Sequence, residues 1–440
     1  MGMSPIATKV KAGDSGPSAQ VPGEDVLGGY KSSEVGLIPK DWVVAAVETL
    51  VDSSSPICYG IVQVGQDTDG GIPVVAIKNV TRIDAAVLHR VSQDRERSFS
   101  RSRVKGGDVL ISIKGTIGRV GLVPDGFDGN ISRELARLRP GPTCFSPYLA
   151  YQLGAEQTQV RISRAVVGTT RQEFSIAALR QFEVALPRAK AEQRAIAQAL
   201  SDVDELLNAL EALIAKKRAI KQAAMQQLLT GRTRLPGCSG EWGTRQLGEL
   251  AETKSGATPS TRVAAYWDGT IPWCTPTDIT GAPGKHLYAT ERSITPEGLA
   301  SCAASLLPPG ALLLCSRATI GELKIATRPT CTNQGFKSLV CRDGVSHEFL
   351  YYLMLTMKPT LIERAVGSTF LEIGRRDIEA IEIRLPPIAE QHAIATVLAD
   401  MDAEITALER RREKTLAIKE GMMQQLLAGR VRLVDPEAVE

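Results

Sequence analysis

The sequence predicts an α+β fold: two β-rich α/β domains separated by two long antiparallel coiled-coil helices, with a pseudo-twofold internal repeat. Three observations predict it. Residues Met225–Leu235 (MQQLLTGRTRL) recur as Met423–Leu433 (MQQLLAGRVRL), with nine of eleven positions identical at an offset of 198. Residues Glu192–Asp204 recur at the same offset as Glu390–Asp402, with eight of thirteen identical. The apolar residues around both copies are spaced as in a coiled coil. One large half of the chain is therefore duplicated.

Each copy lies on a long predicted helix. Apolar residues alternate four and three apart, first at Ile196, Leu200, Val203, Leu207, Leu210 and Ile214, then at Ile394, Leu398, Met401, Ile405 and Leu408. In the second copy we expect Arg412 to interrupt this seam, with Leu416, Ile418 and Met422 on a shifted face. Pro187 and Pro386–Pro387 precede the helices, and Gly231 and Gly429 follow them. Each helix then has about 38 residues and a length of about 57 Å.

The order of the segments predicts the pairing of the helices. The first helix leaves the first globular region and ends shortly before the second, so the second helix must run back antiparallel to bury both seams. We expect a disordered tail (1–30), a first globular region (31–186), its helix (187–236), a second region (237–385), its helix (386–433) and a short tail (434–440).

Short apolar runs between turn signals predict strands in both regions. They are Val74–Ile77, Val109–Ile113 and Val120–Val123 in the first, and Ala311–Cys315, Leu323–Ala326 and Ser338–Cys341 in the second. Helices are expected at Pro147–Gln159 and Glu348–Met357.

Landmarks recur in the same order in the two regions, although the regions have diverged. The matched pairs are Asp41-Trp42 and Glu241-Trp242, Gly107 and Gly310, SIKGTIG (112–118) and CSRATIG (315–321), Asn130 and Asn333, and Gly168-Thr169-Thr170 and Gly367-Ser368-Thr369. We expect this pattern of two domains that share one scaffold but recognise different targets through different loops. Trp42 and Trp242 are expected in the core, not stacked on bases.

Composition limits the possible functions. The net charge is only +3 at pH 7, so nucleic-acid binding would depend on local patches. One stretch, Arg82–Lys105, carries six arginines diluted by acidic residues, and it is either a solvated loop or a phosphate-facing surface. Eight cysteines form no CxxC pair, so buried thiols are expected, and four scattered histidines give no zinc pattern. With no apolar run of 18 residues and no signal peptide, we expect a cytoplasmic protein.

Motifs of catalysis are missing from the sequence. It has no P-loop, no dinucleotide-binding glycine motif, no Asn/Asp-Pro-Pro-aromatic motif of an amino-methyltransferase, and no HExxH or GxSxG motif. A two-headed frame without these motifs favours a binding protein with no metal and no cofactor of its own.

Several further motifs stand out in the sequence. They are IPKDW (38–42), LPRAKAEQ and LPPIAEQ before the helices, the QQLLxGR ends, and SGATPS (255–260), YWDGTIPWCTPTDI (266–279), SRATIG (316–321) and TNQGFKSL (332–339). On these motifs the chain resembles the DNA-specificity subunits of type I restriction–modification systems. The resemblance covers about residues 31–433. The first region lacks the TPS and TNQGFKS strings, so we expect it to have a different target.

The resemblance implies a division of labour. Each globular region would be a target-recognition domain that reads one half of a split, asymmetric site in double-stranded DNA, and the helices would set the gap. The chain would bind modification (methyltransferase) subunits, typically two in this family, and through them the restriction (translocase and nuclease) subunits. S-adenosylmethionine and ATP would act elsewhere in the complex, so this chain is expected to be non-catalytic.

Side chains suited to bases and phosphates are the candidates for DNA contact. They are Lys78, Asn79, Lys114, Arg133, Thr169 and Arg171 in the first region, and Thr275, Thr277, Arg317, Asn333, Gln334, Lys337, Thr369 and Arg375 in the second. Lys114 and Arg317 hold equivalent places beside the Thr-Ile-Gly turn. The candidates for partner contact are Gln193, Gln226, Gln227, Arg232, Gln391, Gln424, Gln425 and Arg430, although these glutamines could instead pair the two helices with each other.

Other functions remain open from the residues. The chain could be a catalytic nuclease or methyltransferase, or a two-headed protein-interaction scaffold that has no salt-dependent DNA affinity. It could also be the specificity subunit of a type II-like enzyme that cuts at a fixed distance.

Overall fold

The computed structural model describes residues 28–167, 172–367 and 371–434. By internal contacts the chain divides into two units, one containing the residues up to Leu207 and from Lys414, and the other Asn208–Glu413. The division therefore passes through both long helices. The predicted tail of residues 1–30 lies mostly outside the described residues, and its last residue, Tyr30, already belongs to a strand.

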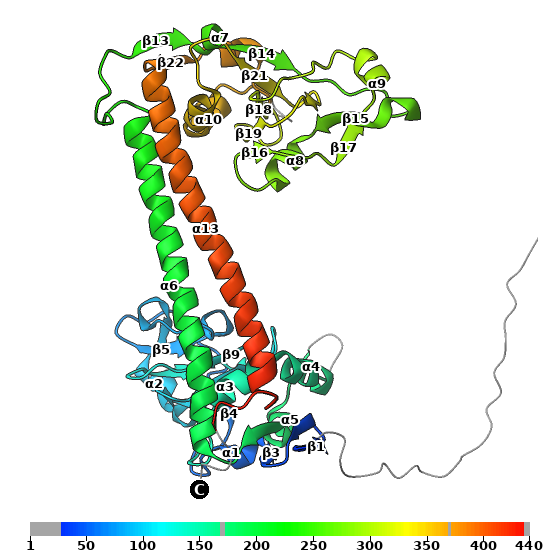
Figure 1. Ribbon diagram of the computed structural model, residues 1–440. Helices are drawn as coiled ribbons and strands as arrows, with labels where there is room; N and C mark the ends of the chain where they lie inside the picture. Colours follow the sequence, from blue (N-terminus) through cyan, green and yellow to red (C-terminus); the bar gives the residue numbers. More distant parts are fainter. Residues whose placement is uncertain (1–27, 168–171, 368–370, 435–440) are drawn as a thin grey trace, which may run out of the picture. The chain divides into compact units, whose positions relative to one another are not determined.

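Both long helices are present, close to the predicted length. Helix α6 spans Lys190–Leu228 and α13 spans Ile388–Leu426, with 39 residues each. Within each unit their segments lie side by side (Figure 1). In the second unit, Glu211 pairs with Arg412, Lys217 with Glu404 and Lys221 with Asp402. The residue numbers of the partners thus rise along α6 while they fall along α13. This order confirms the antiparallel pairing there.

The seam of α13 differs from the prediction at its C-terminal end. Arg412 stays in the seam through its ion pair with Glu211, and Thr415, three residues on, is buried. Leu416 and Ile418, expected on a shifted face, are 42% and 59% exposed. The heptad positions 412 and 415 are thus occupied by polar residues, which hydrophobic spacing alone does not reveal.

The first unit contains short strands and helices beside its part of the long helices. Its strands are β1 (Tyr30–Ser33), β2 (Gly36–Pro39), β3 (Trp42–Ala46), β4 (Cys58–Tyr59), β5 (Ile72–Val75), β6 (His89–Val91), β7 (Val104–Lys105), β8 (Val109–Ser112), β9 (Val120–Leu122), β10 (Asp128–Ile131), β11 (Leu135–Leu138) and β12 (Glu183–Pro187). Its helices are α1 (Val47–Leu50), α2 (Gln93–Arg97), α3 (Ser146–Gly154), α4 (Glu156–Ala165) and α5 (Ile176–Gln181), with the single turns η1 (Ile77–Asn79), η2 (Ala85–Val87) and η3 (Ser100–Ser102).

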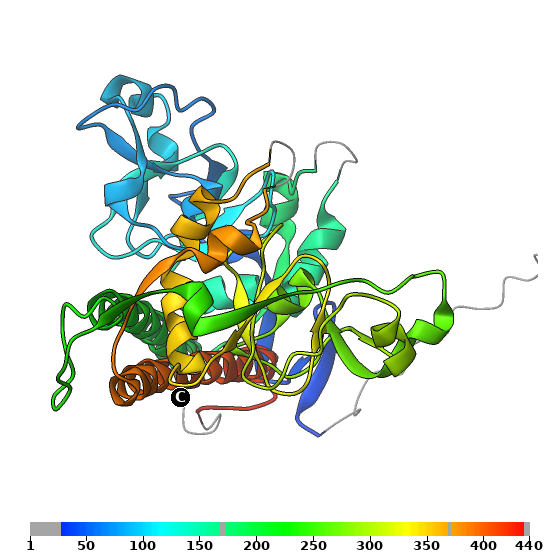
Figure 2. The ribbon, with the colours of Figure 1, turned by 90° about the horizontal axis from the view of Figure 1, so that it is seen from above.

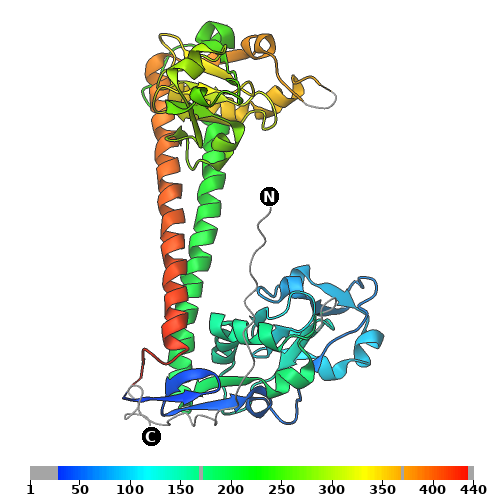
Figure 3. The ribbon, with the colours of Figure 1, turned by 90° about the vertical axis from the view of Figure 1, so that its right-hand side faces the viewer.

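The strands of the first unit form sheets in the orders β1-β2, β6-β5-β10-β7, β4-β11-β8-β9 and β12-β3. The predicted helix at Pro147–Gln159 is two helices, because Ala155 adopts extended backbone at φ −64° and ψ 140°. Gln159 stabilises this break by donating to the Leu153 carbonyl. Viewed from the side, β5 and α2 lie away from α13 (Figure 3).

The second unit repeats this plan. Its strands are β13 (Gly243–Gln246), β14 (Ala251–Ser255), β15 (Trp267–Cys274), β16 (His286–Leu287), β17 (Arg292–Ile294), β18 (Leu312–Leu314), β19 (Leu323–Ala326), β20 (Cys331–Thr332), β21 (Lys337–Cys341) and β22 (Glu382–Leu385). Its helices are α7 (Leu247–Leu250), α8 (Pro276–Gly281), α9 (Pro296–Ala300), α10 (His347–Thr356), α11 (Lys358–Glu363) and α12 (Arg375–Glu379), with the single turn η4 (Ala264–Tyr266).

The sheets of the second unit have the orders β13-β22, β14-β21-β18-β19-β16 and β17-β15-β20. The sheet β17-β15-β20 has its own small core around Trp267 and Trp273 and lies on the side away from α13 (Figure 2). All six predicted strands and the helix at α10 are found within a few residues of their predicted bounds. Both units are thus mixed α/β, as predicted.

The repeated Gln-Gln-Leu-Leu segments anchor the helix ends in the domain cores. Leu228 and Leu229 are buried in the same cluster as Trp242, and Leu426 and Leu427 in the same cluster as Trp42. Trp42 is fully buried and Trp242 is 9% exposed, which confirms that both are core residues. Gly231 and Gly429, at φ +70° and +67°, turn the chain after each helix.

The two tryptophans lie beside equivalent charged clamps. Arg234 makes a bidentate ion pair with Glu390, which also accepts a hydrogen bond from Trp242 Nε1. In the first unit, Arg432 binds both Glu192 and Asp41. The second arginine of each Gly-Arg-x-Arg segment therefore links the C-terminal end of one long helix to the N-terminal end of the other. The sequence did not predict this role.

Candidate nucleic-acid interface

Each domain contains the same tight turn between two antiparallel strands. It joins β8 to β9 in the first domain and β18 to β19 in the second. Two residues in each turn have positive φ: Gly115 (+71°) and Gly118 (+88°) in the first, and Ala318 (+62°) and Gly321 (+85°) in the second. The sequence match of the Thr-Ile-Gly segments is therefore a match of backbone conformation.

A second segment pairs with this turn in each domain. Glu173 bridges Val167 and Lys114 in the first, and Glu372 bridges Val366 and Arg317 in the second. The adjoining backbone bonds are also equivalent, from Phe174 to Ile113 and from Ile373 to Ser316, both at 2.9 Å. The turn and the short ladder next to it thus form one repeated structure.

Lys114 and Arg317 hold equivalent places on it, as predicted. Lys114 Nζ lies 3.3 Å from Glu173 Oε1, and both side chains are about 40% exposed. Arg317 Nη1 lies 4.0 Å from Glu372 Oε2, and Lys337 Nζ lies 3.3 Å from the other oxygen of Glu372. Each exposed cation therefore has one glutamate partner on the neighbouring segment, which a phosphate could replace.

Three other candidates of the first domain, Lys78, Asn79 and Arg133, lie on segments next to its turn. Lys78 and Asn79 are on η1, and a Cβ added to Gly115 would lie 3.3 Å from Ile77, the first residue of η1. Arg133 is exposed, and the adjoining Glu134 accepts a backbone bond from Ile113, next to Lys114. Thr169 and Arg171 lie outside the described residues, as does Thr369 in the second domain.

Several candidates of the second domain also meet at one place. A Cβ added to Gly335 would lie 3.0 Å from Asn333 Oδ1, 3.4 Å from Pro276 and 3.7 Å from Arg317. Arg317 also lines a pocket of about 970 Å³, with the turn, α11 and Glu372 as walls and Thr280 of α8 at its edge. The start of α8 and the Thr-Ile-Gly turn therefore share one surface.

Some of these candidates already have local hydrogen-bond partners. The Thr275 hydroxyl donates to Asp278 in a capping box at the start of α8, and Gln334 accepts from Thr258. Thr277 is exposed on the first turn of α8. Arg375 pairs with Glu379 one turn along α12, and no contact joins it to the cluster in the part of the chain that is described.

The predicted match of Asn130 to Asn333 is wrong. Ile131 pairs with Val75, and Thr332 pairs with Cys274, so Asn333 corresponds to Ser132, two residues further along. Asn130 is fully buried, where its amide binds Ser102, Glu96 and the Phe99 carbonyl. A difference in loop length moved the register, and identity by eye cannot detect that.

Two of the predicted partner-contact residues are structural. Gln193 and Gln391 are buried, and each amide accepts from one backbone N–H (Phe145, Ser346) and donates to two carbonyls. They fasten the start of each long helix to its own domain, so they neither face a partner nor pair the helices. The other six, which are Gln226, Gln227, Arg232, Gln424, Gln425 and Arg430, are exposed.

Sequence reasoning also missed exposed apolar residues at equivalent positions. Val167 and Val366, beside the paired glutamates, are 76% and 71% exposed. Their only sequence signal was their place just before the matched Gly-Thr-Thr and Gly-Ser-Thr segments.

Metal and thiol chemistry find no support in the described residues. Among them no group of three His, Cys, Asp or Glu side chains could hold a metal ion. The cysteines are free, four of them buried and four partly buried. Burial raises the pKa of the Cys144 and Cys341 thiols to about 12, so neither is a ready nucleophile. None of the described helices has the length and apolar character needed to cross a bilayer.

Comparison with known proteins agrees with this duplicated plan. The chain matches a model described as type I restriction modification DNA specificity domain twice, at residues 64–222 and 239–417. It is 38% identical over 175 residues to the MjaIX specificity subunit of Methanocaldococcus jannaschii, a match that covers 39% of this chain and 40% of that protein. It is 24% identical to the putative MjaX specificity subunit of the same organism, covering 92% of this chain and 97% of that one.

Solved structures show the same fold at low identity. The type I restriction–modification S subunit from M. genitalium aligns with a TM-score of 0.56 and 17% identity, over 88% of this chain and 96% of that chain. A chain from a type I restriction–modification complex aligns with a TM-score of 0.58 and 18% identity, over 90% and 99%. With two matches that together span most of its length, the chain belongs to the family of type I restriction–modification DNA specificity domains.

Proposed function

We propose that this chain is the DNA-specificity subunit of a type I restriction–modification complex. The observation that carries the proposal is the duplicated turn and ladder, which presents a cation at the same place in each domain but surrounds it with different side chains. Residues 31–186 and 237–385 would be the target-recognition domains. Each would read one half of a bipartite, asymmetric DNA site.

The polar side chains around each turn suit this task. Arg, Lys, Asn and Gln can reach base edges in the major groove or bind phosphates. In the first domain Lys78, Asn79, Lys114 and Arg133 would contact the DNA, and in the second Thr277, Arg317, Asn333 and Lys337 would do so. The glutamates paired with Lys114 and Arg317 would release them to DNA and would repel misplaced phosphates.

The long helices would set the gap between the half-sites. A helix of 39 residues is about 58 Å long, which corresponds to about 17 base pairs at 3.4 Å each. That length accommodates two short half-sites and a gap that is not read.

The helix ends would bind two methyltransferase subunits, one at each copy of the repeated segment. Each copy lines a pocket, with Met423, Gln424 and Leu427 in the first unit and Met225, Gln226 and Leu229 in the second. The same residues at equivalent positions suit two copies of one partner. Leu206, Leu213 and Ile220, seven residues apart on α6, are each about 40% exposed and would add apolar contact area.

The remaining activities would belong to other subunits. Methyl transfer with S-adenosylmethionine and translocation with ATP would take place on the modification and restriction subunits, and this chain would be non-catalytic. The complex would act on DNA in the cytoplasm.

The test is a methylation map. The chain would be co-expressed with its methyltransferase partner, and modified adenines would be mapped across the genome. The expected result is one split motif, methylated on both strands across a fixed gap. Exchange of residues 31–186 for the matching domain of a relative should change one half of the motif only. An active methyltransferase that yields no motif would refute the proposal and would favour a protein-interaction scaffold.

A further inference from the structure

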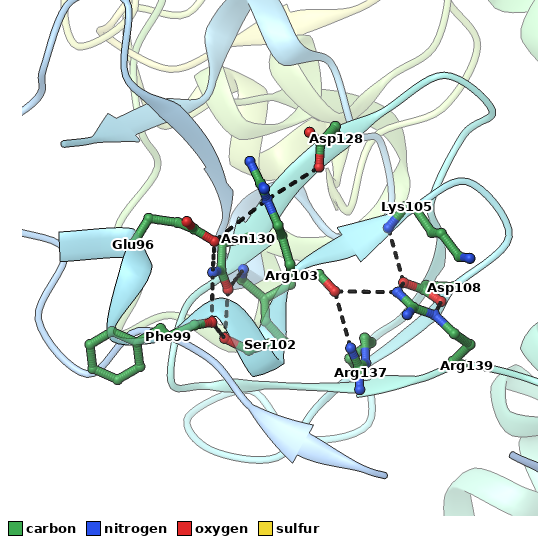
Figure 4. Close-up of polar contacts among 11 residues, drawn as sticks. Glu96, Phe99, Ser102, Arg103, Lys105, Asp108, Asp128, Asn130, Arg137 and Arg139 are labelled. Carbon is green, nitrogen blue, oxygen red and sulfur yellow. Dashed lines mark hydrogen bonds and ion pairs between the residues drawn. The ribbon is translucent and has the colours of Figure 1, made fainter. Parts of the chain in front are cut away.

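A basic pocket lies in the first domain, away from the Thr-Ile-Gly turn. It has a volume of about 360 Å³, and its lining includes Arg101, Arg103, Lys105, Asp128, Arg137 and Arg139. Arg137 and Arg139 lie at the end of β11 opposite to Leu135, the residue that pairs with Ser112 beside the turn. The polar contacts around the pocket are shown in Figure 4.

Arg137 is a buried cation without a carboxylate partner. It is 3% exposed, and among the described residues its guanidinium donates only to the carbonyls of Arg103 (3.1 Å) and Pro56 (3.0 Å). Its Nε has no hydrogen-bond partner, and no acidic side chain in the described ranges forms an ion pair with it. A buried charge left unpaired is costly, so an arginine in this position needs a compensating anion.

The neighbouring acids compensate other arginines. Asp108 is buried and makes a bidentate ion pair with Arg139 at 2.7 Å. Glu96 and Asp128 lie 3.5 and 3.4 Å from Arg103. Figure 4 shows Arg103 between these two carboxylates. The acids near the pocket are thus engaged by Arg139 and Arg103, and Arg137 is left with carbonyl partners.

Two exposed cations at the rim add to the excess of positive charge. Arg101 and Lys105 line the pocket, and neither has an ion-pair partner within the described part of the chain. Both belong to the arginine-rich stretch 82–105, whose role the sequence left open. A bound anion would therefore meet one buried and two exposed unpaired cations.

The fold that the two domains share does not require arginines at positions 137 and 139. Strand pairing aligns Leu135 with Phe336, because each is paired with the residue that precedes the turn (Ser112, Cys315). Arg137 and Arg139 then correspond to Ser338 and Val340 in the second domain. Since the second domain builds the same strand without these arginines, they are a feature of the first domain alone.

We propose that this pocket binds one phosphoryl oxyanion, held by Arg137 with Arg101 and Lys105 at the rim. Arginine donors suit phosphate oxygens in number and geometry. The occupant is a phosphate of the DNA backbone outside the bases read at the turn, which rests on the proposed function. A free phosphate has the same chemistry, and the test separates the two sources.

The test uses the full chain in complex with its methyltransferase partner. DNA affinity is measured by fluorescence anisotropy between 50 and 200 mM salt for the wild type, Arg137→Met and Arg101→Ala. Each lost phosphate contact should lower the steepness of log affinity against log salt by about 0.9, so between 50 and 200 mM the affinity of the variant should fall about threefold less than that of the wild type. Arg97→Met is the matched control, because it removes an arginine charge from an exposed site on α2 that is already paired with Asp94.

The outcomes are distinct. A smaller slope in both pocket variants, with the control and the methylated motif unchanged, supports the proposal, and Arg101→Ala does so even if Arg137→Met fails to fold. An equal change in the control would show a general surface-charge effect and would overturn it. Unchanged slopes, together with a thermal stabilisation by inorganic phosphate that Arg101→Ala weakens, would assign the pocket to a free ligand and overturn the DNA assignment. If the wild type bound DNA without any salt dependence, the proposed function would fail, and the phosphate measurement would still report on the pocket.

Discussion

The amide of Gln391 offers a sharp test of how each long helix is held to its domain. It is 1% exposed. Oε1 accepts from Ser346 N–H at 2.8 Å, and Nε2 donates to the carbonyls of Gly344 and Pro386 at 3.1 and 2.9 Å. Gln391→Ala removes all three bonds and leaves a cavity. At about 1 kcal/mol per bond, with about 1 kcal/mol for the cavity, the variant should lose about 3–4 kcal/mol of unfolding free energy.

Urea unfolding followed by tryptophan fluorescence would measure this loss, because Trp242, Trp267 and Trp273 all belong to the second unit. With a slope of about 2–3 kcal/mol per molar urea, the midpoint of the second unit should fall by about 1–2 M. Gln226→Ala is the control, since that glutamine is exposed, belongs to the same unit and should cost under about 0.5 kcal/mol. A midpoint for Gln391→Ala equal to that of the control would refute the assigned role.

Three further predictions concern the turn, the clamp and the DNA contact. Ala318→Gly should stabilise the second unit by up to about 1 kcal/mol and so raise its thermal midpoint, because Ala318 has φ +62° where the first domain has Gly115. The hydrogen bond from Arg432 holds the pKa of Asp41 below its usual 3.8, so the stability it adds is present above that pH and is lost below it. Arg432→Met should therefore be less stable at pH 7 and should lose less on acidification, as urea midpoints at pH 7 and 3 would show. Arg317→Ala should weaken binding to DNA that contains the mapped target motif about 5- to 100-fold in anisotropy titrations. An affinity equal to that of the wild type would show that Arg317 does not contact the DNA.

Sequence patterns identified the frame of this protein because they report local and periodic constraints. The repeated Met225–Leu235 segment, the heptad spacing and the flanking prolines predicted α6 and α13, and short apolar runs predicted the strands around the turns. The equivalence of Lys114 and Arg317 was also visible, since the residues around them recur in order. Such features depend on residues that are close together in the chain, and the sequence shows these directly.

Tertiary structure alone decided which polar side chains are buried and what they bind. The sequence suggested that Gln193 and Gln391 lie on the surface. In the fold they are buried, and their amides bind backbone groups of the domain. Arg412 looked like a break in the seam until Glu211, far away in sequence, paired with it. Arg137 gave no signal beyond a basic residue in an apolar run, and the missing carboxylate beside it is a property of distant segments. The sequence by itself determined the duplicated architecture. Only the tertiary structure decided which charges are paired, because each pair joins residues that are far apart in the chain.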